Sequence, residues 1–270
     1  MNDAYHPSLA ASCADDAAWP IMIRLLGNFR LLHAGEPVPV RAGGRTEALL
    51  AHLALQYGRR VPREQLVQML WPASDLAHAL HSLNTTVYTL HKLLGPALQG
   101  AAPIIHEEGF YRLNVEAGIG VDVACFDYLV HAGDQHARAG DHASALIAYQ
   151  RAAELYRGDL SVASGTQIVI ERERLRAAFL TLLTKLADHE YHAADYSACL
   201  EYLWRLLARD PCREDAHRLV MRCYVRRGER AAALRHYQLC VDILQSDCGV
   251  APEPATVELL EQIRSQPESI

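Results

Sequence analysis

The chain has 270 residues, of which half are apolar, and a formal net charge of −6. These values predict a globular protein of one large or two ordinary domains, with enough apolar residues for sizeable cores. No apolar run reaches the roughly 20 residues that cross a bilayer, and the N-terminus lacks the basic start and continuous apolar stretch of a signal peptide. We therefore expect a cytoplasmic protein that binds no membrane and that starts with a disordered tail at residues 1–20.

The charge is distributed unevenly along the chain. Residues 1–20 contain three acidic residues and no Lys or Arg, residues 21–120 carry a net charge of +2, and residues 121–270 carry a net charge of −5. A mildly basic front part followed by an acidic back part is typical of a nucleic-acid-binding module joined to a separate interaction module. Because +2 is a small excess, the assignment depends on the motifs.

The front part begins with the pattern of strands and continues with that of helices. Short β-rich runs alternate with turn signals at Gly27-Asn28 and Gly35-Glu36-Pro37, which predicts a small antiparallel sheet. Apolar residues then recur at helical spacing up to Gly58, and a second, shorter helix must end near Trp71 because a proline follows it. Two short β runs around Gly109 predict a terminal hairpin.

A third predicted helix, between Trp71 and Gly95, is amphipathic. A stripe of large apolar residues is expected to pack on the first two helices, and it consists of Leu76, Leu80, Leu83, Val87, Leu90 and Leu94. The opposite face carries hydrogen-bonding side chains with hardly any formal charge, namely His81, Asn84, Thr85, Tyr88 and Lys92, flanked by Thr89 and His91. Sheet, three helices and terminal hairpin together predict a winged helix-turn-helix.

The back part repeats itself. Three segments align without gaps: GDHASALIAY from Gly140, ADYSACLEYL from Ala194 and GERAAALRHY from Gly228. The second and third start 34 residues apart, which is the tetratricopeptide period, and an extended helix over residues 167–192 accounts for the longer spacing of the first two. Each repeat has a small residue where paired helices must approach closely, namely Ala145, Cys199 and Ala233. The pattern predicts stacked helical hairpins.

These segments together resemble a known family. The order of IRLLGNFRL, GGRTEALLAHLAL, GRRVPREQLVQMLWP, the long helix and GFYRL is similar to the OmpR-like winged helix that opens the Streptomyces antibiotic regulatory protein family. LYRGDL and DCGVAPEPATVELLEQI in the back part are similar to its second domain, the bacterial transcriptional activator domain. The resemblance implies a mainly α fold with a small β component, in which a DNA-binding winged helix-turn-helix at residues 21–120 precedes an all-α, tetratricopeptide-like domain at residues 121–270.

The resemblance also implies a function, that of a DNA-binding transcriptional regulator and activator. The helix at about residues 75–94 would enter the major groove and read promoter half-sites. The arginines that the family has in its second half fall at Thr89 and His91, only Lys92 keeps a basic side chain there, and Glu47 stands where the family often has a basic residue. Because each phosphate contact releases counterions, we expect weak non-specific binding with a shallow salt dependence.

Other side chains favour DNA binding. Asn84 can pair with an adenine edge, and hydroxyl or imidazole groups beside it can bond bases or phosphates. The residues expected to contact DNA are His81, Asn84, Thr85, Tyr88, Thr89, His91, Lys92, Arg45 and Arg112. Since an unperturbed histidine titrates near pH 6.5, protonation of His81 and His91 is expected to tighten binding as the pH falls.

The motifs of enzymes and metal sites do not occur in the sequence. There is no GxSxG, HExxH or Gly-rich phosphate loop, so we expect no catalytic residue, metal or cofactor. His189 and His192 have helical spacing, which is more often a helix surface than a metal site. Seven scattered cysteines without a CxxC pair indicate neither a disulfide framework nor a zinc site, and reduced, mostly buried thiols are expected.

A second interpretation is a ligand-binding or protein-binding module that does not recognise DNA. Helical repeats form concave grooves, and arginines there could hold an acidic peptide or a phosphate-bearing effector such as a nucleotide messenger. The candidates are Arg172, Arg174, Arg176, Arg222, Arg226 and Arg227. The alternation of acids and arginines in ERERLR equally suits intrahelical ion pairs. The expected partners are double-stranded promoter DNA and RNA polymerase, while a homodimer and a small-molecule effector stay open.

Overall fold

The computed structural model describes residues 13, 18–41, 43–161 and 166–270. The chain divides into two compact units, Met1–Arg176 and Ala177–Ile270. Within the described ranges, no helix is long and apolar enough to cross a membrane. Helices dominate, and a small sheet component lies near the N-terminus, so the predicted fold class is confirmed.

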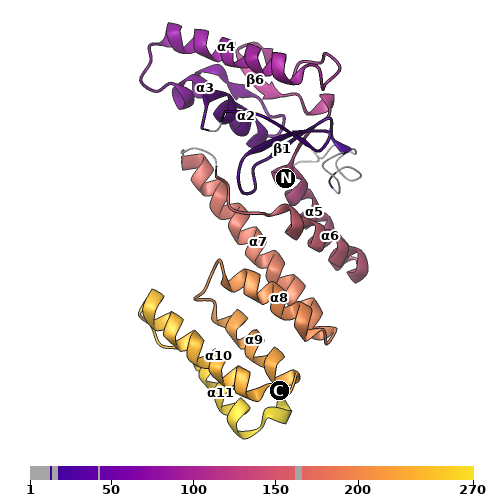
Figure 1. The fold of residues 1–270 in the computed structure, drawn as a ribbon, viewed down its shortest axis with the longest axis vertical. Coiled ribbons are helices and arrows are strands. Elements are labelled where there is room, and N and C mark those ends of the chain that lie inside the picture. The colour runs from indigo at the N-terminus through magenta and orange to yellow at the C-terminus, as the bar shows by residue number, and fades with distance from the viewer. Residues whose placement is uncertain (1–12, 14–17, 42, 162–165) are drawn as a thin grey trace. The chain divides into compact units, whose positions relative to one another are not determined.

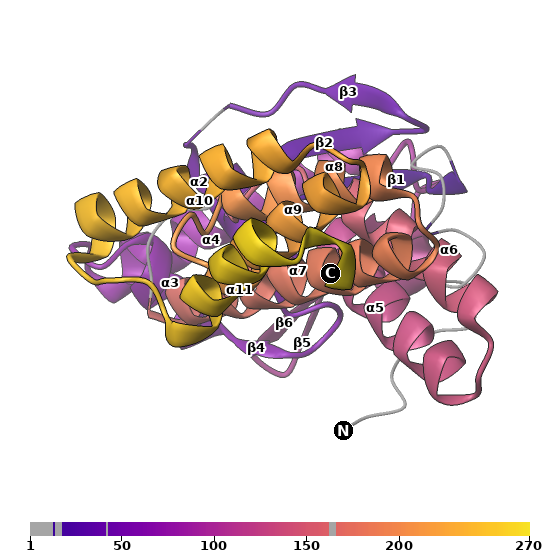
Figure 2. The ribbon, with the colours of Figure 1, turned by 90° about the horizontal axis from the view of Figure 1, so that it is seen from below.

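The described strands of the first unit form two small sheets. The first has the order β3-β2-β1-β7, in which β1 pairs antiparallel with β2 and parallel with β7. The second has the order β4-β6-β5, and Figure 2 shows its strands as a group separate from β1, β2 and β3. The strands are β1 (Ile21–Arg24), β2 (Arg30–His33), β3 (Glu36–Val38), β4 (Val61–Pro62), β5 (Ile104–Glu107), β6 (Phe110–Leu113) and β7 (Ile119–Val121).

The predicted terminal hairpin is formed by β5 and β6. Its turn residues Glu108 and Gly109 both have positive φ, at 52° and 82°. Two consecutive positive φ values are typical of the tight turns whose twist matches that of antiparallel strands. The hairpin places His106 opposite Tyr111 and Ile105 opposite Arg112.

Three helices pack against one another next to this hairpin: α2 (Arg45–Leu55), α3 (Arg63–Leu70) and α4 (Leu76–Leu94). Figure 1 shows α4 at the outer edge of the first unit, with α2 and α3 beside it. The buried face of α4 consists of Ala79, Leu83, Thr86, Leu90 and Leu94. The predicted apolar stripe was therefore partly wrong, because Leu76 is 61% exposed and two other members of the stripe, Leu80 and Val87, are only half-buried. Thr86 is accommodated in the interior because its hydroxyl donates to the Ser82 carbonyl at 2.8 Å.

The remaining long helices form the repeat region: α5 (Asp122–Arg138), α6 (His142–Leu155), α7 (Thr166–His192), α8 (Tyr196–Leu207), α9 (Glu214–Arg226), α10 (Arg230–Ile243) and α11 (Pro254–Ser265). The short helical turns are η2 (Val115–Ala117), η3 (Leu244–Cys248) and η4 (Pro267–Ser269). The three aligned segments correspond to α6, α8 and α10. The extended helix expected over residues 167–192 is α7.

The three repeats share one turn conformation. Gly140, Ala194 and Gly228 all have positive φ, at 80°, 60° and 76°. The next residue is the N-cap of the following helix, and the carboxylates of Asp141 and Asp195 accept hydrogen bonds from backbone N–H groups three residues on. These caps satisfy donors that the first turn of a helix leaves free. The small residues expected at close helix contacts, Ala145, Cys199 and Ala233, are all buried, as that prediction requires.

The first helix of the repeat region is bonded to the sheet of the front part. The Asp122 carboxylate is buried and accepts hydrogen bonds from the backbone N–H groups of Leu25 at 2.8 Å and Leu26 at 2.9 Å. Burial raises the pKa of Asp122 to about 7, although the backbone hydrogen bonds oppose that shift. The Ser161 hydroxyl donates to the Gly27 carbonyl at 2.6 Å. The domain boundary expected at residues 120/121 thus falls inside the first compact unit, and as a boundary between separately folding domains it stays a prediction.

One cysteine prediction was wrong. Cys13 and Cys125 form a disulfide, and both side chains are buried. The two residues are 112 positions apart, so no local spacing could indicate the bond. The predicted N-terminal tail lies largely outside the described residues, but Cys13 and Trp19, which are described, are buried.

Candidate nucleic-acid interface

The solvent-facing side of α4 is the candidate interface. The helix starts after Asp75, whose carboxylate caps it by accepting from the His78 backbone N–H at 3.0 Å. Most predicted DNA-contacting residues of this helix are exposed, namely His81, Asn84, Thr85, Tyr88, Thr89 and Lys92. Tyr88 is 69% exposed, which is unusual for so large a side chain in a folded monomer. The exposed face therefore offers amide, phenol, hydroxyl, imidazole and ammonium groups to a partner.

The two threonines on this face are bonded to their own helix. The Thr85 hydroxyl donates to the His81 carbonyl at 3.0 Å, and the Thr89 hydroxyl donates to the Thr85 carbonyl at 2.8 Å. Each hydroxyl proton is thus already donated to a carbonyl of α4. The oxygen atoms can still accept hydrogen bonds, so these threonines suit donors such as base amino groups better than phosphate oxygens.

The Asn84 side chain accepts a hydrogen bond from the hairpin. The Tyr111 hydroxyl donates to Asn84 Oδ1 at 3.2 Å, while Tyr111 itself is only 2% exposed. Burial raises the pKa of Tyr111, which keeps the phenol protonated as a donor. The exposed His106 ring stacks on the Tyr111 ring at 4.2 Å. The Asn84 amide nitrogen and one oxygen lone pair stay available for a ligand.

Sequence reasoning missed Tyr111 and His106. Their sequence signal was the hairpin itself, because a register that centres the turn on Glu108 and Gly109 places these two residues opposite each other. The contact with Asn84 had no sequence signal, since it joins residues 27 positions apart on different elements.

His91 is hydrogen-bonded to the hairpin. Its Nε2 lies 3.0 Å from the Ile104 carbonyl oxygen, and because a carbonyl can only accept, this nitrogen carries the proton. The side chain is half-buried between α4 and β5. This contact does not support the expectation that His91 faces DNA.

The predicted cationic contacts at the edges of this face already have partners. Arg112 is paired with Glu116 at 2.9 Å, and the Arg45 guanidinium lies 5.9 Å from the centre of the Trp71 ring. Ion pairs near the surface contribute only about 0–1 kcal/mol each, so a phosphate can compete for Arg112. Lys92 is exposed on α4 itself.

The hairpin turn is acidic. Glu107 and Glu108 lie 3.5 Å and 4.0 Å from the Arg60 guanidinium, and all three side chains are exposed. One arginine faces two carboxylates, which leaves a net negative charge at this tip. A winged helix that inserted this turn beside a DNA backbone would meet electrostatic repulsion.

The arginines expected to hold an effector are engaged or lie in different units. Arg174 binds the carboxylates of Asp127 and Glu171, both at 2.7 Å at the closest, and Arg172 Nε donates to the Leu160 carbonyl at 2.7 Å. Arg227 pairs with Glu229 at 2.9 Å. Arg172, Arg174 and Arg176 belong to the first unit, whereas Arg222, Arg226 and Arg227 belong to the second, so a common anion site stays a prediction.

A cavity of about 740 Å³ lies in the first unit beside Arg174. Three acidic side chains line it, those of Glu116, Asp127 and Glu171, against two arginines. Burial raises the pKa of Asp127, while the hydrogen bonds from Arg174 oppose the shift. Such a lining does not favour a phosphate-bearing effector. In the part of the chain that the structure describes, no three His, Cys, Asp or Glu side chains are grouped to hold a metal ion.

Comparison with known proteins gives one family and several relatives. The family described as the bacterial transcriptional activator domain matches residues 121–264. Regulatory protein DnrI of Streptomyces peucetius is 28% identical over 240 residues, which cover 86% of this chain and 88% of that protein. Transcriptional regulatory protein MoaR1 of Mycobacterium tuberculosis is 25% identical over 252 residues, 92% of this chain and 81% of that protein. Transcriptional regulator RedD of Streptomyces coelicolor is 27% identical over 245 residues, 86% and 67% of the two chains.

A solved structure extends the similarity to the fold. The structure of Mycobacterium tuberculosis EmbR in complex with a low-affinity phosphopeptide matches with a TM-score of 0.74 at 25% identity. The match covers 93% of this chain and 68% of that one. The winged helix and the helical repeats are thus both part of the shared architecture.

Proposed function

The chain belongs to the bacterial transcriptional activator domain family and is a DNA-binding transcriptional regulator, and from this premise we propose that α4 reads promoter DNA through its exposed face. The observation that carries the proposal is the row of exposed hydrogen-bonding side chains on α4, opposite the buried stripe that fixes the helix on α2 and α3. A helix anchored along one side and free along the other fits the major groove. We further propose that residues 21–120 bind DNA, while residues 121–270 contact RNA polymerase or a second copy of the chain.

Within this face, Asn84 is proposed as the main base-reading residue. An Asn side chain can bond both N6 and N7 of an adenine, and this requires a defined amide orientation. The hydrogen bond from Tyr111 supports that orientation before DNA arrives. Fixing a side chain in advance reduces the entropy that binding would otherwise cost.

We assign phosphate contacts to Lys92, Arg45 and Arg112, and additional polar contacts to His81 and Tyr88. Three phosphate contacts per copy predict a slope of log affinity against log salt concentration of about −3, since each contact contributes about −0.9. This slope is shallow for a DNA-binding protein. The acidic tip at Glu107 and Glu108 supports a weak electrostatic contribution.

The test is fluorescence anisotropy on the full chain with DNA enriched from a random pool, compared with a scrambled duplex of equal composition. Asn84→Ala should lose about 1–3 kcal/mol on the selected sequence and little on the scrambled one, whereas Lys92→Ala should weaken both alike and reduce the salt slope by about 1. Asn28→Ala is a matched control, because Asn28 is also exposed but lies in the turn between β1 and β2. If no sequence is enriched, the proposal that α4 reads promoter DNA is wrong; if Asn84→Ala behaves like Asn28→Ala, Asn84 is not the base-reading residue.

A further inference from the structure

The second unit contains five cysteines, and four of them form two pairs with neighbouring sulfur atoms. Cys199 and Cys223 lie with their Sγ atoms 3.4 Å apart, and both are buried. Cys212 and Cys248 lie with their Sγ atoms 2.7 Å apart, but here Cys248 is exposed and Cys212 is half-buried. A shift of about 0.7 Å would bring this second pair to the S–S bond length of about 2.05 Å.

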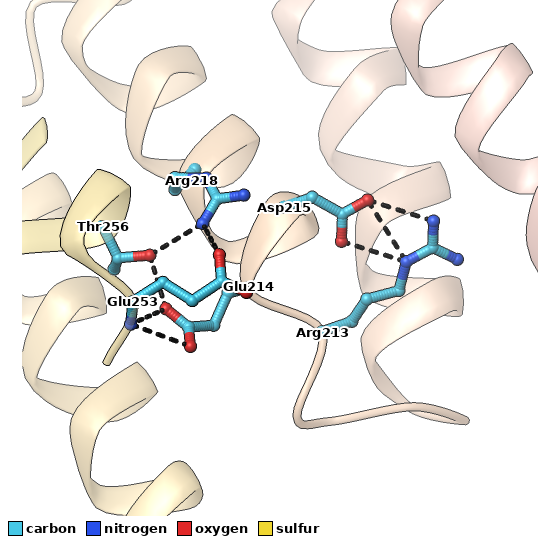
Figure 3. A network of polar contacts seen from close by, with 6 residues as sticks. All are labelled: Arg213, Glu214, Asp215, Arg218, Glu253 and Thr256. Atoms are coloured by element: carbon cyan, nitrogen blue, oxygen red, sulfur yellow. Dashed lines mark hydrogen bonds and ion pairs between the residues drawn. The ribbon is translucent and has the colours of Figure 1, made fainter. Parts of the chain in front are cut away.

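The two segments that carry this exposed pair are already held together. Cys212 stands just before α9, and Cys248 is the last residue of η3, between α10 and α11. Next to them, the buried Glu214 carboxylate accepts from the Glu253 backbone N–H at 2.9 Å and from the Thr256 hydroxyl at 2.5 Å (Figure 3). This clamp joins the start of α9 to the start of α11.

A second layer of the same clamp comes from Arg218. Its guanidinium donates to the Glu253 carboxylate at 2.8 Å and to the Thr256 hydroxyl at 2.9 Å, as Figure 3 shows. Contacts that do not involve sulfur therefore join the start of α9 to the start of α11. With these elements held in this arrangement, the Sγ atoms of Cys212 and Cys248 lie 2.7 Å apart.

We propose that Cys212 and Cys248 are a modification site, at which a small peroxide such as hydrogen peroxide oxidises the two thiols to a reversible disulfide. In the first step the Cys248 sulfur attacks one peroxide oxygen, an S–O bond forms, the O–O bond breaks and a water molecule leaves. The Cys212 sulfur then attacks the resulting sulfenic acid, the S–S bond forms, the S–O bond breaks and a second water leaves. Two thiols and one hydrogen peroxide thus give one disulfide and two waters, and a dithiol reverses the reaction.

The order of these steps follows from exposure and charge. Cys248 is the exposed partner, so the peroxide reaches it first. The neighbouring Cys248 thiol, burial and the carboxylates of Asp247 and Asp210 raise the pKa of Cys212 to about 11, which disfavours Cys212 as the first nucleophile. Cys199, Cys223 and Cys240 are buried and stay out of reach. Of the five cysteines in the second unit, exposure therefore favours Cys248 and its neighbour Cys212 for oxidation.

The bond would close a loop that contains α9 and α10, since the two cysteines are 36 positions apart. A cross-link of this length restricts the unfolded chain and so stabilises the folded one. We expect the oxidised second unit to melt several degrees higher than the reduced one. Oxidation would thereby stiffen the region in which α9, α10 and α11 meet.

The experiment treats the full-length protein with hydrogen peroxide, blocks the remaining thiols with N-ethylmaleimide and identifies linked peptides by mass spectrometry. Cys240 shares a tryptic peptide with Cys248, so an additional cleavage before Asp247 separates the two. The expected product joins Cys212 to Cys248, has lost two hydrogen atoms and disappears after treatment with dithiothreitol.

Three variants make the result decisive. In Cys212→Ser, dimedone should trap a sulfenic acid at Cys248, because the resolving thiol is gone. Cys240→Ser should still form the linked peptide, since the buried Cys240 has no role. Cys248→Ser should leave Cys212 alkylated. The proposal is overturned if the native protein gives only sulfinic acid at Cys248, only links between two chains, or a Cys212 link to Cys240.

Discussion

A buried histidine pair makes the stability of the second unit depend on pH. His217 Nε2 donates to the Pro211 carbonyl at 2.7 Å, and its Nδ1 lies 2.9 Å from His236 Nε2. Since the carbonyl fixes the proton on Nε2, a neutral His217 must accept at Nδ1 from His236. Burial, followed by the charge of His217, lowers the pKa of His236 to about 4, and burial also lowers the pKa of His217.

The sign and size of the effect follow from these shifts. A histidine with a lowered pKa in the folded state contributes stability that is fully present above the unfolded value near 6.5 and is lost as the pH falls toward 4. At about 1.4 kcal/mol per pKa unit, His236 accounts for a loss of about 3 kcal/mol across this range. The side chain is only 4% exposed, so screening by solvent reduces this value little.

The perturbation is His236→Gln, which retains an amide donor for His217 but does not titrate. Urea unfolding is followed from pH 7.5 to 4.5 by the fluorescence of Trp204, whose ring lies 5.3 Å from that of His236. Trp19 and Trp71 are replaced by phenylalanine, so that Trp204 is the only tryptophan. The variant should lose about 2–3 kcal/mol less than its parent between pH 6.5 and 4.5.

A matched control is His142→Gln, which alters an exposed histidine at the start of α6. This variant should keep the pH slope of the parent. Equal slopes for the parent and His236→Gln would refute the reasoning, because the loss of stability would then come from other groups.

Two further predictions concern packing in the first unit. Asp122→Ala removes the acceptor of the Leu25 and Leu26 N–H groups and should lower the free energy of unfolding by about 2–5 kcal/mol in urea titrations; a loss below about 0.5 kcal/mol would show that water replaces the carboxylate. Gly133→Ala places a Cβ 2.5 Å from the Tyr149 ring, where α5 and α6 touch, and should cost about 1–3 kcal/mol in the same assay; unchanged stability would mean that the tyrosine moves aside freely.

The repeat region could be predicted from the sequence because its signals are local. A small residue at Ala145, Cys199 and Ala233 is required wherever two helices cross closely, and the three positions can be aligned without knowing the fold. The turn before each repeat helix is also local, because a residue with positive φ is followed by an N-cap. Each of these features depends on residues within one turn or one helix.

Features that join distant residues could not be predicted in this way. Asp122 bonds to backbone groups 96 and 97 positions away, and no spacing rule connects an aspartate at the start of one helix with the end of a strand. The Cys13–Cys125 disulfide has the same character. The buried face of α4 was misplaced for a different, local reason, since Thr86 looks polar in the sequence but satisfies its hydroxyl within the helix.

The candidate interface contains features that the sequence predicts from local spacing and features that depend on contacts between distant residues. The exposure of Asn84, Thr85, Tyr88 and Lys92 follows from helical periodicity, which the sequence displays directly. The contact from Tyr111 to Asn84 and that from His91 to Ile104 depend on how the hairpin seats against α4. These two contacts decide which polar side chains are free to meet a ligand, and only the folded chain contains that information.

These contacts also bear on how a helix with so little charge can act on DNA. Few cations on α4 and an acidic hairpin tip reduce the attraction to any duplex, so the affinity for random DNA falls first. The proposed base contact through Asn84 would not depend on salt in the same way. The ratio of the affinity for the specific site to the affinity for random DNA is then preserved, although the affinity of a single copy of the chain is low. We therefore expect occupancy of a promoter to require two adjacent half-sites, where a second copy of the chain adds its own contacts and raises the effective concentration of the first.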